Sequence, residues 1–126
     1  MIINCLVVGA GGFVGSVFRY LISLVPVLNK EALPLQTLLV NVLGAIVIGM
    51  IIKASESVDA IEGNTLLFLK VGLCGGFTTF STFALETFNM FEDGRFLGSM
   101  TYIVLSVVLC VVGVYIGRLI MQILGL

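Results

Sequence analysis

Long apolar stretches separated by short polar segments run through this chain. There are four of them, at residues 2–28, 35–52, 65–91 and 96–117. A helix needs about 20 mainly apolar residues to cross the hydrocarbon core of a bilayer. The polar segment KASESVDAIEGN separates the second stretch from the third, and EDGR separates the third from the fourth. The pattern predicts a single domain, residues 1–126, that contains four membrane-spanning helices.

The membrane itself restricts the secondary structure of these stretches. In hydrocarbon each backbone N–H and C=O group must find a partner inside the protein, which favours helices over open sheets. The stretches also lack the strict alternation of apolar and polar residues that is typical of membrane β-barrels. We therefore expect an all-α membrane protein. Pairs of glycines four residues apart favour close packing of its helices, and they occur at 11 and 15, 72 and 76, and 113 and 117.

The composition supports this interpretation and excludes several functional classes. Sixty per cent of the residues are hydrophobic, only 10% are charged, and the mean hydropathy is +1.24, whereas soluble domains are about 25% charged. A net charge of -1 provides no basic surface for nucleic acid. Without histidine there is no imidazole base or imidazole metal ligand. Three widely separated cysteines, Cys5, Cys74 and Cys110, predict no disulfide framework.

The charges that flank the four stretches do not favour one orientation in the membrane. Lys53 and Arg118 fall on the side of both termini, and Lys30 and Arg95 fall on the opposite side. An excess of Lys and Arg on one side normally sets the orientation, and here the two sides are equal. The chain is therefore expected to insert both ways up and to pair as an antiparallel homodimer. The alternative is one orientation that other features determine.

The most polar part of a spanning stretch is GLCGGFTTFSTF, residues 72–83. Two adjacent glycines, Gly75 and Gly76, each weaken a helix by roughly 1 kcal/mol relative to alanine, and four hydroxyl residues follow. We expect a break in the third helix here. A break releases backbone carbonyls, which suit a hard cation such as Na⁺. The alternative is a continuous helix whose hydroxyls bond back to its own carbonyls.

Other polar and aromatic residues at membrane depth are candidates for an ion path. Phe80 and Phe83 share one helix face, and the positive edges of their rings can attract an anion weakly enough to release it. Asn41 is either a donor to that anion or an interhelical clamp. Arg19 either anchors its helix at the interface or supplies a positive field in a vestibule. Glu86 is expected near a mouth or bonded to a neighbour.

Taken together, the motifs GGFVGSVFRY, TLLVNVLGA and GLCGGFTTFSTF resemble those of the small Fluc (CrcB) fluoride channels. The resemblance extends over three of the four stretches. It implies a dual-topology antiparallel homodimer in the plasma membrane that exports fluoride passively and selectively. It also implies a structural Na⁺ ion at the dimer centre, held by the backbone carbonyls of Gly75 and Thr78, and no enzymatic activity.

The resemblance also assigns residues to the fluoride path. Phe80 and Phe83 match the family's phenylalanine pair, Asn41 matches its pore asparagine, and Ser81 and Thr82 match hydroxyls beside the ion. Arg19 matches a basic residue of the vestibule. The fourth helix departs from the family, because Cys110 occupies the position where a serine is common. Either Ser106, one turn earlier, supplies the contact or the polar track is weaker here.

Two other functional classes remain open at this point. A small four-helix drug/proton antiporter can also be dual-topology, but it needs an ionisable group in its chamber, usually a carboxylate of the first span. Here no acidic residue precedes Glu31, Glu86 is the only carboxylate inside a span, and there is no tryptophan to stack on a cationic drug. An assembly subunit without transport activity would explain the glycines but not the cluster at residues 72–83.

Overall fold

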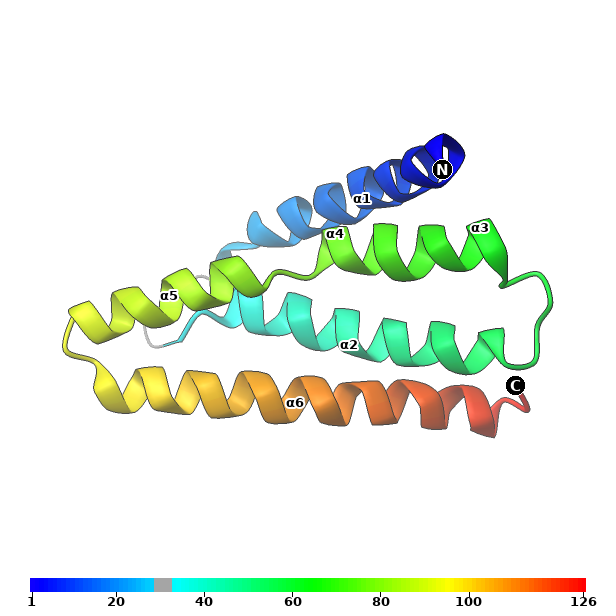
Figure 1. Cartoon of the computed structure of the whole chain (residues 1–126). Coiled ribbons are helices and arrows are strands. Elements are labelled where there is room, and N and C mark those ends of the chain that lie inside the picture. The colour runs from blue at the N-terminus through cyan, green and yellow to red at the C-terminus, as the bar shows by residue number, and fades with distance from the viewer. Residues whose placement is uncertain (29–32) are drawn as a thin grey trace.

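The computed structural model of the chain describes residues 1–28 and 33–126, and every regular element within them is helical. Four helical spans are long and apolar enough to cross a membrane: Ile2–Ser23, Leu35–Ser55, Gly63–Glu92 and Phe96–Ile123. The all-α membrane fold with four spans is thereby confirmed. Both termini lie at the same end of the molecule as the α2–α3 connection (Figure 1). Lys30 and Glu31 lie outside the described residues.

The first and last spans differ in length from the expected ones. Helix α1 (Ile2–Ser23) ends before residue 28 because Pro26, which lacks an N–H donor, opens the short 3₁₀ turn η1 (Pro26–Leu28). Helix α6 (Phe96–Ile123) continues past residue 117. The charge of Arg118 does not end it, because the guanidinium pairs with Glu56.

The third span is assembled from several helical pieces. It begins with α3 (Gly63–Leu66), continues as the wide π-helical segment η2 (Leu67–Cys74), and closes its first half with α4 (Gly75–Phe77). Thr78 and Thr79 are extended, and α5 (Phe80–Glu92) forms the second half. The break therefore begins at Thr78, two residues after the glycine pair, and Gly75 and Gly76 are themselves helical.

Gly76 is small because α1 packs against it. A Cβ atom at Gly76 would lie 2.5 Å from the carbonyl oxygen of Gly12, and one at Gly11 would lie 2.5 Å from that of Phe68. Both distances are far inside van der Waals contact. The glycine spacing thus serves close packing of α1 on the first half of the third span, as the motif predicts. Gly75 faces open space instead.

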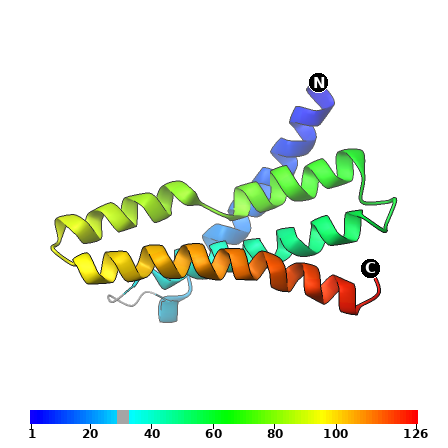
Figure 2. The same ribbon diagram turned by 60° about the horizontal axis from the view of Figure 1, so that its bottom comes forward.

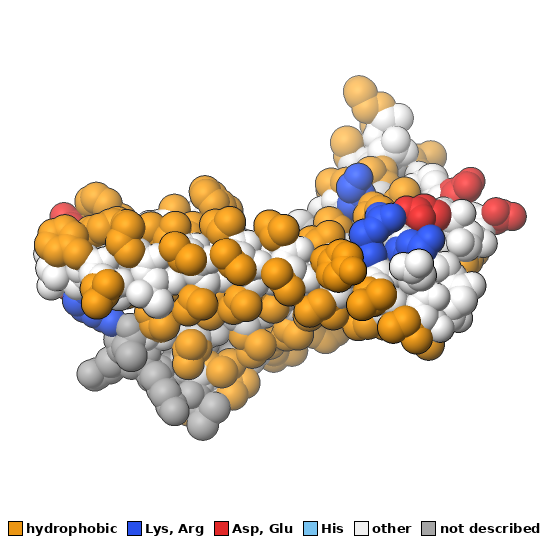
Figure 3. Space-filling view, turned by 90° about the horizontal axis from the view of Figure 1, so that it is seen from below, with side chains coloured by type: hydrophobic (Ala, Val, Ile, Leu, Met, Phe, Trp, Pro, Cys, Tyr) orange, Lys and Arg blue, Asp and Glu red, His pale blue; other side chains and the backbone are white. Residues whose placement is uncertain are grey.

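Helix α6 packs along α2 (Leu35–Ser55), where Gly49 meets the main chain of Val114 and Gly117 meets that of Ile46. Helix α1 lies against the third span and diverges from α6 (Figures 1 and 2). Hydrophobic side chains cover most of the face seen in Figure 3, and charged side chains gather at its ends. This distribution suits a belt of lipid around the middle of the molecule.

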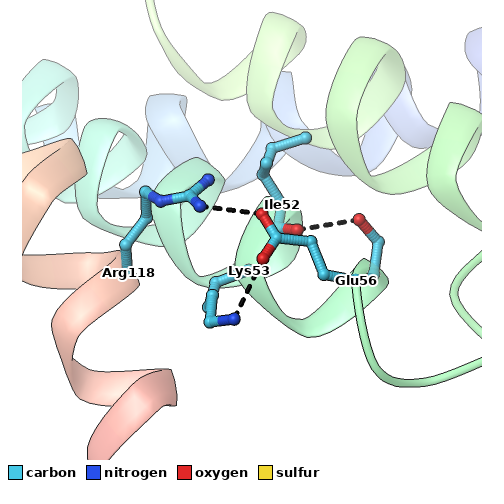
Figure 4. A network of polar contacts seen from close by, with 5 residues as sticks. Ile52, Lys53, Glu56 and Arg118 are labelled. Carbon is cyan, nitrogen blue, oxygen red and sulfur yellow. Dashed lines mark hydrogen bonds and ion pairs between the residues drawn. The ribbon is translucent and has the colours of Figure 1, made fainter.

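A small ion-pair network joins the ends of α2 and α6 (Figure 4). Glu56 lies beyond the last residue of α2, 2.9 Å from the Nζ atom of Lys53 and 2.7 Å from a guanidinium nitrogen of Arg118. Hydrogen bonds from Lys53 and Arg118 hold the pKa of Glu56 below its ordinary value. The network is exposed, so its contribution to stability is small.

Candidate functional site

The break in the third span is held by the side chain of Asn41 on α2. The main-chain N–H of Thr79 donates to Asn41 Oδ1 at 2.8 Å, and Asn41 Nδ2 donates to the carbonyl of Thr79 at 3.0 Å. One amide side chain therefore satisfies both main-chain groups of an extended residue at membrane depth. Asn41 is the interhelical clamp that the sequence allowed. The second N–H of Nδ2 makes no hydrogen bond within the part of the chain that the structure describes, and Asn41 also lines a groove.

The clamp and the N-cap of α5 together leave two main-chain carbonyls without their helical partners. In a continuous helix, Gly75 would accept from Thr79 and Thr78 would accept from Thr82. Here the Thr79 N–H donates to Asn41, and the Thr82 N–H donates to the hydroxyl of Thr79 at 3.2 Å. Among the described residues no hydrogen bond ends on either carbonyl. Gly75 and Thr78 both line the same groove as Asn41.

Hydroxyl groups organise the start of α5. Thr79 is its N-cap, and the Thr79 hydroxyl donates to Thr82 Oγ1 at 2.9 Å. Ser81 Oγ lies 3.4 Å from the same hydroxyl, and Ser81 itself is exposed. The hydroxyl of Thr78 donates to the carbonyl of Cys74 at 2.8 Å. This is the bond to a carbonyl of the same helix that the alternative interpretation expected of the hydroxyls. Of the four hydroxyl residues, Thr79 and Thr82 are therefore the two whose hydroxyls are hydrogen-bonded to each other at 2.9 Å.

Most of the predicted ion-path residues meet in one groove between α2, the third span and α6. This apolar groove has a volume of about 490 Å³ and is open along one side. Most of its surface is apolar, which means that the few polar groups lining it act in a low dielectric. The predicted residues that line it are Asn41, Gly75, Thr78, Phe80, Phe83, Ser106 and Cys110.

A row of tilted aromatic rings leads from this groove into the protein. The rings of Phe80 and Phe83 are 5.5 Å apart, and those of Phe83 and Tyr102 are 5.2 Å apart, with interplanar angles of 52° and 57°. Phe80 is 79% exposed, Phe83 is 9% exposed, and Tyr102 is fully buried. Tilted rings present edges as well as faces, and the edge is the positive part of the ring.

Tyr102 is therefore a core residue of the site. Its hydroxyl donates to one carboxylate oxygen of Glu86 at 2.7 Å. The hydroxyl of Thr37 donates to the other carboxylate oxygen at 2.8 Å. Glu86 is thus bonded to neighbours on α2 and α6, one of the two outcomes expected for it.

A second cavity, here called the polar pocket, lies between α1, α2 and α5. Its volume is about 330 Å³, and Arg19, Thr37, Thr79, Thr82 and Glu86 are among its lining residues. Arg19 makes no ion pair within the described segments of the chain and shares this pocket with Glu86. Its position agrees with the vestibule interpretation.

Ser106 is the fourth-helix hydroxyl with an unmet bond. Its Oγ atom is buried, and no hydrogen-bond partner for it exists among the residues that the structure describes. A buried hydroxyl without a partner costs free energy, so an unpaired one calls for a ligand or water. Cys110 also lines the apolar groove, one turn further along α6.

Comparison with known proteins places the chain in a family. A family model described as "CrcB-like protein, Camphor Resistance (CrcB)" matches residues 6–118. The chain belongs to this CrcB-like family. The chain is 45% identical to a protein of Ruminiclostridium cellulolyticum named fluoride-specific ion channel FluC, over 93% of this chain and 91% of that protein. It is 43% identical to a protein of the same name from Methanocaldococcus jannaschii, over 94% of each chain. Every site residue described above lies within the matched range.

Sequence reasoning missed three residues of this CrcB-like site as participants: Thr37, Thr79 and, in its bond to Glu86, Tyr102. Thr37 is four residues before Asn41 and so lies on the same face of α2, a signal that was available in the sequence. Thr79 stands between two predicted residues in the hydroxyl cluster. No sequence pattern indicates that its main chain is the one that Asn41 holds.

Proposed function

We propose that this chain is a fluoride-selective ion channel that lets fluoride leave the cytoplasm passively. The observation that carries the proposal is the similarity to channels named for fluoride over more than nine-tenths of the chain. The four apolar spans make the chain a multi-pass membrane protein. The relatives' shared name describes a channel, in agreement with the expectation that the chain is not an enzyme.

The groove suits a small, strongly hydrated anion. Removing water from such an ion is expensive unless polar groups replace the water. Within the described part of the chain, the second N–H of Asn41 and the hydroxyl of Ser106 have no partner. Together with the ring edges of Phe80 and Phe83, they are modest donors that supply this replacement. None of these four groups carries a full positive charge, so each binds the ion weakly enough to release it, although the ammonium-bearing side chain of Lys70 also lines the groove. We propose that Ser106, and not Cys110, supplies the fourth-helix contact, because a thiol is a weaker donor than a hydroxyl.

Passive export needs only an existing electrical gradient. A membrane potential that is negative inside drives an anion outward by about 2.3 kcal/mol per charge for each 100 mV. The groove and the polar pocket therefore need no coupled energy source. In this proposal Arg19 raises the local concentration of anions at the mouth, since a positive field attracts them.

A second copy of the chain in the opposite orientation would complete the channel. In the single chain the apolar groove is open, and Phe80 projects from it with 79% of its surface exposed. The equal numbers of flanking Lys and Arg on the two sides of the sequence favour insertion both ways up. An antiparallel partner would cover the groove and enclose two ion paths, one for each chain.

The same dimer suggests a structural Na⁺ ion. Oxygen atoms are the ligands that hard cations take. In each chain the clamp at Asn41 frees the carbonyl of Gly75 and the N-cap hydroxyl of Thr79 frees that of Thr78. When bound, Na⁺ would balance the partial negative charge of these carbonyls at the dimer centre. The residues therefore fit the ion. We expect a higher unfolding temperature of the purified dimer in NaCl than in KCl at equal ionic strength, and equal temperatures would contradict the proposal.

Growth in fluoride tests the function in cells. A bacterium that lacks its own fluoride channel should grow in otherwise inhibitory fluoride when it expresses this chain, and it should not grow when it expresses Phe83→Ile at the same level. A matched control is Leu109→Ile, a conservative change at an exposed position of α6 that lines neither cavity, which should protect as well as the wild type. Failure of the well-expressed wild type to protect would favour the antiporter or assembly-subunit alternatives.

A further inference from the structure

We propose that Thr79 is the crossing point of the anion between the apolar groove and the polar pocket, and that its hydroxyl helps to determine which anion crosses. This inference rests on the proposed channel function and adds a residue to it. Among the described residues, Thr79 is the only one that lines both cavities. Phe80 and Ser106 line the groove side, and Arg19 and Glu86 line the pocket side.

The main chain of Thr79 is fixed from both directions. Its N–H and C=O groups are both bonded to the side chain of Asn41. The residue is only 8% exposed, although it lies at an irregular, extended part of the chain. A crossing point formed by this residue therefore has a fixed main chain and little exposure, and a fixed geometry is what discrimination between anions of different size requires.

The hydroxyl of Thr79 can serve both sides in turn. It donates to Thr82 Oγ1, which leaves the proton of the Thr82 hydroxyl available to the polar pocket. A hydroxyl rotates about its C–O bond at little cost and has one donor and two acceptor positions. Rotation of the Thr79 hydroxyl toward the groove would present its proton to an anion beside Phe80. The Thr79–Thr82 pair can thus pass the anion from one donor to the next.

Substitutions that keep the N-cap separate this role from a structural one. Serine, asparagine and aspartate all accept the hydrogen bond that caps α5, so all three variants retain the cap. We expect Thr79→Ser to retain fluoride flux within about threefold, because the hydroxyl remains. Thr79→Asp should lower flux roughly 100-fold or more relative to Thr79→Asn, because a fixed negative charge repels an anion strongly in a low dielectric.

The control is Thr87→Val on the same helix. The Thr87 hydroxyl is buried and bonds to the carbonyl of Phe83, but Thr87 is not a lining residue of either cavity. This variant removes a buried hydroxyl from α5 and should leave fluoride flux and the exclusion of chloride unchanged. Fluoride and chloride efflux from liposomes, with size-exclusion profiles of each variant, provide the measurements.

Three results would overturn the inference while leaving the proposed function in place. The first is that the wild-type protein conducts fluoride and that Thr79→Asp and Thr79→Asn conduct it at equal rates. If the aspartate variant does not fold, flux through Thr79→Val equal to that through Thr79→Ser is the second. The third is a loss of flux in Thr87→Val as large as that in Thr79→Asp. Failure of the wild type to conduct fluoride would instead contradict the proposed function itself.

Discussion

Asn41 and Thr79 form a closed two-bond pair across the helix break. The amide oxygen of Asn41 accepts from the Thr79 N–H at 2.8 Å, and the amide nitrogen donates to the Thr79 carbonyl at 3.0 Å. An irregular backbone at membrane depth is tolerated only where its polar groups are satisfied. The pair meets this condition at Thr79, and because it uses the Thr79 N–H it also frees the carbonyl of Gly75. The clamp and the candidate ion site are therefore one structural unit.

Asn41→Asp should abolish fluoride flux and destabilise the fold. A carboxylate has no N–H to donate to the Thr79 carbonyl, and a buried backbone group left without a partner costs about 1–3 kcal/mol. The new negative charge would also lie beside the proposed anion path. Fluoride efflux and thermal unfolding of the purified variant measure the two effects. Wild-type values of both would show that the pair is unimportant.

Phe80→Ile and Phe83→Ile should each reduce fluoride flux by about tenfold or more and leave the protein folded. Isoleucine replaces most of the apolar volume but has no positive ring edge to present to an anion. Phe83 is the more buried of the two, so Phe83→Ile should also cost about 1–3 kcal/mol of stability, because it removes buried volume. Undiminished flux in both variants, measured by liposome efflux, is incompatible with a role for the ring edges.

Gly11→Ala should destabilise the protein, whereas Gly9→Ala on the same helix should not. A Cβ atom at Gly11 would lie 2.5 Å from the carbonyl oxygen of Phe68 and 2.9 Å from Cα of Gly72, and one at Gly9 would meet nothing within 4 Å. Forcing extra volume into packed helices costs about 1–3 kcal/mol, while alanine favours the helix itself by about 1 kcal/mol. Unfolding temperatures in detergent compare the two variants, and equal values would contradict the packing described for α1.

The link between α2 and α6 at Glu56 should weaken in acid. The folded protein lowers the pKa of Glu56 from its ordinary 4.5, so its contribution to stability is present above 4.5 and is lost as the pH falls through the lowered value. Glu56→Gln should remove this part of the pH dependence. An identical acid profile of unfolding for the variant and the wild type would show that the ion pairs do not contribute.

The sequence predicts the spans well because each is defined by bulk hydropathy. It also predicts that the third span breaks between residues 72 and 83. It does not predict that Gly76 is helical, since the reason for a glycine there is the main chain of Gly12 on another helix. In the same way, a composition-based argument can assign Asn41 as clamp or donor, but only the fold shows that its partner is Thr79.

For the candidate site, too, the sequence predicts which residues take part but not how they are grouped. The sequence is enough to select individual candidates, such as Glu86, an ionisable residue inside a span, or Phe80, an aromatic residue beside hydroxyls. Their groupings cannot be predicted in this way, because Thr37, Glu86 and Tyr102 come from three helices whose relative rotation depends on packing. The tilt of the aromatic rings and the bonds of Glu86 therefore appear only in three dimensions.

Fluoride efflux from liposomes tests the central claim most directly. Purified protein would be reconstituted in Na⁺-containing buffer into liposomes loaded with KF, valinomycin would carry K⁺ outward, and a fluoride electrode would record the outside solution. We expect rapid fluoride efflux that depends on valinomycin, and no chloride efflux from matched KCl-loaded liposomes. No fluoride efflux from folded protein, or equal efflux of chloride, would contradict a fluoride-selective channel.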